Sequence, residues 1–137
     1  MPSTNHIAGP LAAYTLTAGF ADVPDIALEL AQRPTPILLL AVVKVGNAFA
    51  GVRAPSLQLA QDGVQIPGSL EPMWFGAAGE ETTMLIGRVP DPIVGEIYTI
   101  QGIQDTDNTQ TIGVGDALLV GIALPADQAR LADLIVP

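Results

Sequence analysis

Residues able to carry out nucleophilic or acid–base chemistry are few and scattered along this chain. His6 is the single histidine, and the chain has no cysteine. The serines are Ser3, Ser56 and Ser69, and none of them lies in a Gly-x-Ser-x-Gly sequence. A catalytic nucleophile needs a base and an orienting group beside it. We therefore expect no catalytic residues and no enzyme activity, and we interpret His6 as an incidental surface residue.

Two carboxylates, Glu80 and Glu81, are adjacent in the sequence. A glycosidase needs two carboxylates that flank a cleft at about 5–10 Å from each other. Neighbouring residues of a strand point to opposite faces of a sheet. The pair therefore favours a solvated loop over an acid–base site.

A cluster of oxygen-bearing side chains follows residue 104. Asp105, Asp107, Thr109 and Asp116 are similar to a calcium-binding loop in their spacing. Such a loop requires a glycine at its sixth position for a sharp turn, and this position holds Gln110. We expect a polar hairpin turn here, no bound metal, and no loss of stability on chelation.

A short glycine pair, Gly113-Val-Gly115, is the only trace of a nucleotide-binding motif. It lacks the third glycine and the following helix of the dinucleotide fingerprint. The sequence therefore predicts no cofactor.

Three large apolar residues, Met73-Trp74-Phe75, lie between glycines and prolines that indicate a loop. They could cap the core or contact another subunit, since tryptophan is enriched at binding hot spots. They could also stack against a sugar ring. These three interpretations stay open at this point.

The elements that would position these residues are short strands. Glycine (14) and proline (12) recur between short apolar runs in a chain of 137 residues, which indicates one all-β domain. Ile37–Val45 is predicted as the central strand, buried on both faces, and 21–25 as a turn. The pattern predicts a jelly-roll β-sandwich of about eight antiparallel strands. The predicted strands are 11–20, 26–31, 37–45, 56–60, 64–66, 82–89, 97–103, 109–114 and 117–124.

The two ends of the chain differ from its middle. Residues 1–12 lack apolar periodicity and predict an N-terminal arm outside the core. Residues 13–125 form the predicted jelly-roll domain. Residues 126–137 have helix-favouring composition, with Leu131, Leu134 and Ile135 at helical spacing, and predict a C-terminal tail with one or two helical turns. The arm is expected to hold the protein to a larger partner, and the tail is expected to pack either on the assembled subunits or on that partner.

Charge and hydropathy exclude several classes of partner. The chain has 5 basic and 14 acidic residues, and the basic ones are scattered, so direct binding to nucleic acid or to an anionic membrane is not expected. The longest apolar run, 36–43, is far shorter than the ~20 residues that cross a bilayer. Residues 1–6 lack the basic region of a signal peptide.

Apolar residues make up 49% of the chain and charged residues only 14%, against a usual ~25%. A chain with so few charges and no membrane segment hides apolar surface against other subunits. Composition thus predicts an assembly component rather than a free monomer.

Four segments follow one order that resembles a known group of modules: 20–28, 36–43, 57–68 and 111–125. They look like the small trimeric jelly-roll modules of tumour-necrosis-factor/C1q-like shape found in phage head fibres, capsid decoration proteins and tail fibres. An Asp-Gly-Val hairpin, here Asp62-Gly63-Val64, and a final apolar strand recur in those modules. The resemblance covers residues 14–125 and leaves the tail unassigned. It implies a homotrimer without enzyme activity.

These expectations favour a phage virion structural protein, namely a capsid decoration or cement protein. Its expected partner is the major capsid protein of a phage head, and its expected place is the capsid surface after synthesis in the host cytoplasm. The alternative is a receptor- or glycan-binding module of a fibre or tail, which would need an exposed aromatic platform.

Overall fold

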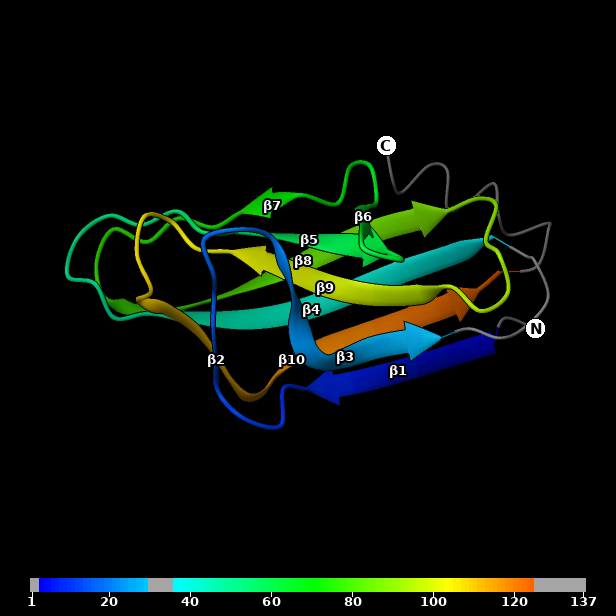
Figure 1. The fold of residues 1–137 in the computed structure, drawn as a ribbon, viewed down its shortest axis with the longest axis horizontal. Coiled ribbons are helices and arrows are strands. Elements are labelled where there is room, and N and C mark those ends of the chain that lie inside the picture. Colours follow the sequence, from blue (N-terminus) through cyan, green and yellow to red (C-terminus); the bar gives the residue numbers. More distant parts are fainter. Residues whose placement is uncertain (1–2, 30–35, 125–137) are drawn as a thin grey trace.

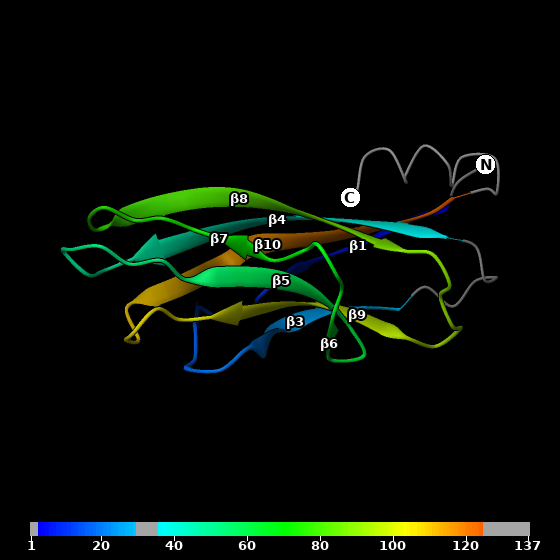
Figure 2. The same ribbon diagram turned by 90° about the horizontal axis from the view of Figure 1, so that it is seen from above.

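A computed structural model describes residues 3–29 and 36–124, and this part of the chain forms a jelly-roll β-sandwich without helices (Figures 1 and 2). The strands are β1 (Ser3–Gly9), β2 (Tyr14–Thr15), β3 (Ala21–Glu29), β4 (Ile37–Asn47), β5 (Ser56–Gln61), β6 (Val64–Gln65), β7 (Glu71–Pro72), β8 (Gly79–Val89), β9 (Ile97–Ile103) and β10 (Gln110–Ala123).

The strands form two antiparallel sheets. The first sheet has the order β1-β10-β4-β8, with β2 paired to β10. The second has the order β3-β9-β5-β6, with β7 paired to β5. Figure 2 shows the two sheets as stacked layers. Most pairs join strands far apart in the sequence; β1 and β10, for example, lie near opposite ends of the chain.

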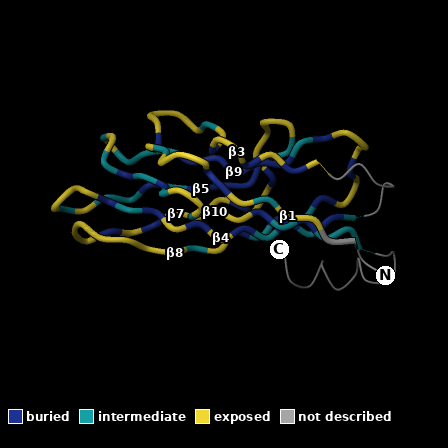
Figure 3. Tube along the Cα trace, turned by 90° about the horizontal axis from the view of Figure 1, so that it is seen from below, coloured by how far each residue is buried: buried dark blue, intermediate teal, exposed yellow. Residues whose placement is uncertain are grey.

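The core lies between the sheets and follows from strict alternation along the strands. In β4 the odd-numbered residues from Ile37 to Val45 are buried. They meet Leu57, Leu59 and Ile100 from the second sheet in one apolar cluster. Figure 3 shows buried residues along the strands and exposed residues in the loops at both ends. Each fully buried aliphatic side chain contributes about 1.5–3 kcal/mol to this packing.

The predicted central strand is confirmed in place but not in its burial. β4 lies between β10 and β8, as a central strand should. The prediction that it is buried on both faces is wrong, because its even-numbered residues are partly or fully exposed. A two-layer sandwich covers only one face of each sheet.

The predicted N-terminal arm is wrong for residues 3–9. They form β1, an edge strand in continuous register with β10 from Ser3↔Ala123 to Gly9↔Ala117. Main-chain hydrogen bonds hold an edge strand without apolar alternation, so the polar sequence gave no signal, although Ile7 packs against the core. The predicted tail, 126–137, lies outside the described residues.

Two other predicted boundaries are wrong. The predicted strand 11–20 is reduced to the two residues of β2, followed by the buried Leu16. The predicted turn 21–25 is part of β3, where the register shifts between Asp22 and Ala27 and Asp25 has φ of 67°. This bulge bends the strand without ending it.

The Asp62-Gly63 turn is confirmed. It joins β5 to β6, and both residues have positive φ, 48° and 81°. A two-residue hairpin loop of type I′ requires this conformation at both positions, which Asp-Gly adopts readily.

We predict that Leu39→Ala lowers the free energy of unfolding by about 2–5 kcal/mol, because Leu39 is fully buried and its truncation leaves a cavity. Urea denaturation measures this change. Val64→Ala is the control, since Val64 is 69% exposed and should change stability by less than about 0.5 kcal/mol. Equal losses in the two variants would contradict this assignment of the core.

Candidate functional site

The outer face of the first sheet carries apolar side chains on three adjacent strands. The register places Met84, Val42 and Leu118 opposite one another across β8, β4 and β10. The next row along the strands holds Ile86, Leu40 and Val120, and the row after that holds Arg88, Leu38 and Ile122. We call these apolar residues the outer face: Leu38, Leu40, Val42, Met84, Ile86, Leu118, Val120 and Ile122.

The outer face is most open to solvent in the row next to Lys44, and its other apolar residues are partly exposed. Met84 is 57% exposed, Val42 42% and Leu118 36%. The solvated face of an antiparallel sheet normally carries polar residues, and contiguous exposed apolar patches mark interaction sites. Sequence reasoning missed this site because it placed both faces of 37–45 inside the core.

Charged groups border the outer face at one end. Lys44 Nζ lies 2.6 Å from Glu80 Oε2 across β4 and β8. The hydrogen bond and charge of Glu80 raise the pKa of Lys44. A shallow groove of about 330 Å³ lies here, lined mainly by Val42, Lys44, Thr82, Asp116 and Leu118. The apolar area therefore ends in a charged rim, as interfaces commonly do.

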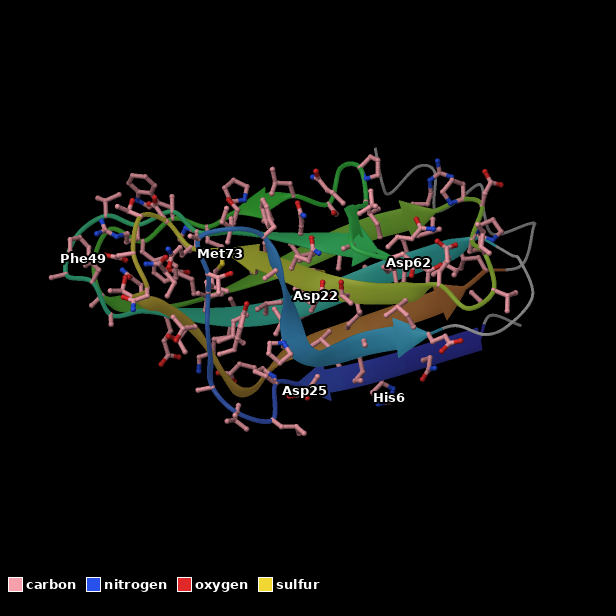
Figure 4. All side chains as sticks on the ribbon, viewed as in Figure 1. His6, Asp22, Asp25, Phe49, Asp62 and Met73 are labelled. Atoms are coloured by element: carbon pink, nitrogen blue, oxygen red, sulfur yellow. The ribbon has the colours of Figure 1, made fainter. Side chains whose placement is uncertain are left out.

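The histidine and serine residues considered for catalysis do not come together in the structure. His6 is exposed on β1, opposite Val120, at the margin of the outer face (Figure 4). Ser69 is buried near β5 of the other sheet, and its hydroxyl bonds to the backbone of Leu59 and Ile66. Ser56 belongs to β5, and Ser3 to β1.

Glu80 and Glu81 lie in β8 rather than in a loop, so that part of the prediction is wrong. Both residues are exposed, as expected of solvated groups. Glu80 pairs with Lys44 on the outer side of the sheet. Consecutive strand residues point to opposite faces, which separates the two carboxylates.

The polar segment after β9 is a connection between the sheets, not a hairpin turn, because β9 and β10 belong to different sheets. Asp105 accepts hydrogen bonds from the Ala54 N–H (2.7 Å) and the Thr106 hydroxyl (2.9 Å). Asp107 accepts from Arg53, Thr109 and Gln110. Among residues 3–29 and 36–124 no group of three His, Asp or Glu side chains is placed to hold a metal.

Arg53 links the loops at this end of the sandwich. Its Nη2 lies 2.7 Å from Asp107 Oδ2, and its guanidinium lies 3.5 Å from the centroid of the Phe49 ring. Its backbone forms an antiparallel bridge with Phe75. The hydrogen bond from Arg53 holds the pKa of Asp107 well below its ordinary value. A hydrogen bond from the Ala54 N–H lowers the pKa of Asp105.

The Met73-Trp74-Phe75 segment divides between two roles. Met73 and Phe75 are 5% and 3% exposed and cap the core, which confirms that interpretation for these two residues. Trp74 is 68% exposed. Backbone hydrogen bonds from Met73 N–H to Pro55 (2.8 Å) and between Phe75 and Arg53 hold it in place. Subunit contact and ligand stacking therefore both stay open for Trp74.

The glycine pair Gly113 and Gly115 lies in a bulge within β10, where the register with β4 shifts. Gly115 has φ of 73°, and its N–H donates to the carbonyl of Pro10. The segment continues as a strand, so it has no helix N-terminus for a phosphate.

Comparisons with known proteins support the fold and go no further. No family model matches the chain, and no curated protein matches it. A chain from the structure of the infectious bursal disease virus Gx strain matches with a TM-score of 0.53 and 10% identity, over 93% of this chain. This chain spans only 34% of that viral chain. At this identity the likeness shows the fold alone.

Two further solved structures are similar at lower scores. Murine APRIL matches with a TM-score of 0.46 and 10% identity, over 90% of this chain and all of its own. Eiger TNF from S. frugiperda matches with a TM-score of 0.45 and 5% identity, over 89% of this chain and 92% of its own.

The described part of the chain contains no helix that could span a membrane.

We predict that Asp107→Asn destabilises the protein more at neutral pH than in acid. The lowered pKa of Asp107 means that its stabilising contribution is present above the unfolded pKa of about 4 and is lost as the pH falls through the folded value. The difference in melting temperature between wild type and variant should therefore be full above about pH 5 and shrink below about pH 4.

The reciprocal variant Arg53→Gln should show a smaller pH-dependent part of the same sign, because Thr109 and Gln110 still donate hydrogen bonds to Asp107. The double variant should add no further pH dependence, because the two groups act as one pair. A difference that stays constant from pH 7 to pH 3 would contradict the role of this ion pair.

Proposed function

We propose that this protein is a virion structural protein that decorates or cements a phage capsid as a homotrimer, by non-covalent contacts and without catalysis. The observation that carries the proposal is the apolar outer face of β8, β4 and β10. An exposed sheet face of Leu, Ile, Val and Met side chains is typical of a surface that binds another protein chain.

Self-association is the simplest way to cover this face. The chain combines 49% apolar residues with 14% charged residues, and the eight apolar residues of the outer face lie side by side on three adjacent strands. Obligate interfaces between identical subunits resemble a domain core cut in half. The outer face has that character, with the Lys44–Glu80 pair at its rim.

The number three and the capsid come from the resemblance in residues 14–125 to trimeric modules of phage virions. A cyclic trimer places each outer face against a different surface of its neighbour and closes the ring. The proposed partner of the trimer is the major capsid protein, and its proposed place is the outside of the head. Cementing requires added interface and no chemical step, which agrees with the separation of His6 from Ser56 and Ser69.

We predict that Leu40→Glu disrupts self-association, because it places a charge in the middle of the outer face. Sedimentation equilibrium at micromolar concentration should give three times the 14.2 kDa of one chain for wild type, or a multiple of that mass if trimers associate further, and a smaller mass for the variant. Val64→Glu, on β6 of the other sheet, should keep the wild-type mass. A wild-type protein that sediments as one 14.2 kDa chain would end the trimer proposal.

The capsid role has its own test with the same variants. Wild type and Val64→Glu are expected to bind expanded phage heads that lack this protein, whereas Leu40→Glu binds with lower occupancy because it loses multivalency. If the wild-type trimer failed to bind such heads, the trimer proposal would stand and the capsid function would be wrong.

The second candidate function is glycan binding at Trp74, favoured by its 68% exposure between two buried anchors. A rigid exposed indole can stack against the apolar face of a sugar ring. Trp74 is the only tryptophan, so intrinsic fluorescence reports directly on this position.

If this candidate is correct, titration with oligosaccharides should shift the emission of Trp74, and Trp74→Ala should abolish binding measured by calorimetry. Leu70→Ala is the matched control, since Leu70 is 47% exposed and not aromatic. A glycan array without hits, or a trimer in which acrylamide no longer quenches Trp74, would remove this candidate.

A further inference from the structure

The edges of the two sheets are not equally protected against pairing with another chain. β3 carries a bulge, Pro24 and the charged side chains of Asp22 and Asp25. β6 and β7 are two residues long. β1 packs beside β3 of the other sheet (Figure 1). Bulges, proline, charge and short length are the usual means of blocking an open edge.

β8 carries the charged residues Glu80, Glu81 and Arg88, but it has no bulge, no proline and no shortening. It is 11 residues long, contains neither proline nor lysine, and pairs with β4 in one unbroken register from Asn47↔Gly79 to Ile37↔Val89. In the described part of the chain, β4 is the one strand that pairs with it. A long regular edge of this kind is a template for an added strand.

The hydrogen-bond phase shows which residues of β8 face the open edge. The Leu124 N–H donates to the Pro36 carbonyl (2.8 Å), next to the pair Ile37↔Ala123. In an antiparallel sheet hydrogen-bonded pairs alternate with non-bonded pairs. The even residues of β4 therefore bond to β10, and its odd residues bond to β8. It follows that Glu80, Thr82, Met84, Ile86 and Arg88 direct their N–H and C=O groups to the open edge.

We propose that two copies of this chain pair through β8 in antiparallel fashion, with the two-fold axis at Met84. This register is the one that overlaps all 11 residues of both strands. It places Glu80 opposite Arg88 of the partner subunit at both ends of the pair. Opposite charges in directly facing positions stabilise a strand pair, whereas like charges destabilise it.

The remaining positions of the pair fit the same register. Thr82 faces Ile86 of the partner subunit, and Met84 faces Met84 of the partner subunit. All of these side chains lie on the outer side of the sheet, so the two outer faces become one continuous apolar surface across the axis. A second copy fits this edge because the register opposes Glu80 and Arg88 at both ends and leaves no like charges facing each other.

This pairing uses the main chain of β8, whereas the proposed trimer uses side chains of the outer face. The two contacts are therefore separable, and the strand pairing does not rest on the proposed function. If both operate, each trimer offers three β8 edges, and strand pairing links one trimer to the next.

Single-cysteine variants test the pairing cleanly because the chain has no cysteine of its own. Hydrogen-bonded antiparallel pairs have Cα atoms about 5.5 Å apart, which a disulfide can span. Met84→Cys should form a disulfide-linked dimer under mild oxidation. Val114→Cys, 64% exposed on the bulge of β10, is the control and should stay unlinked.

The register is tested by mixing. Thr82→Cys and Ile86→Cys should each fail to cross-link alone and should cross-link when the two proteins are combined. Faster linkage of Thr82→Cys with itself than with Ile86→Cys would overturn the register. Failure of Met84→Cys to link faster than Val114→Cys would overturn the pairing.

Charge exchange gives an independent readout. Glu80→Arg and Arg88→Glu should each weaken dimer formation, since each places like charges opposite one another, and an equimolar mixture should restore it.

Leu40→Glu in the Met84→Cys background separates the trimer proposal from the β8 pairing. Loss of the trimer with continued cross-linking means that the trimer contact and the β8 pairing are distinct, whereas loss of both together would overturn a β8 pairing that is independent of the trimer.

Discussion

The structure depends on one constraint, the burial of a single face of each sheet against the other. Along β4 the odd residues enter this interface and are nearly inaccessible to solvent. Alternation then forces the even residues outward, although Leu38, Leu40 and Val42 are as apolar as their neighbours. The outer face therefore follows from the core. The odd residues of β4 are buried between the sheets, and its equally apolar even residues are left on the outside.

Several polar side chains in the described part of the chain hold its loops together. Asp105 and Asp107 accept hydrogen bonds from Ala54, Thr109 and other loop groups, and Arg53 is held between Asp107 and Phe49. These contacts order the loops at one end of the sandwich and hold Trp74 at a defined place on its surface.

Three surfaces of different character remain for binding. The outer face offers aliphatic side chains, the loop end offers the indole of Trp74, and the edge of β8 offers main-chain donors and acceptors. Side-chain burial, aromatic stacking and strand addition are separate interactions with separate geometries.

The sequence by itself determined the all-β class, the central place of β4 and the Asp62-Gly63 hairpin, because period-two alternation, a continuous apolar run and turn chemistry are local properties. Only the tertiary structure decided that Ser3–Gly9 is a strand, that 21–25 is a bulge and that Leu40 and Met84 face outward on neighbouring strands. Alternation shows that two faces differ, but not which of them another layer covers. Main-chain pairing between distant segments such as β1 and β10 leaves no mark in the composition of either strand.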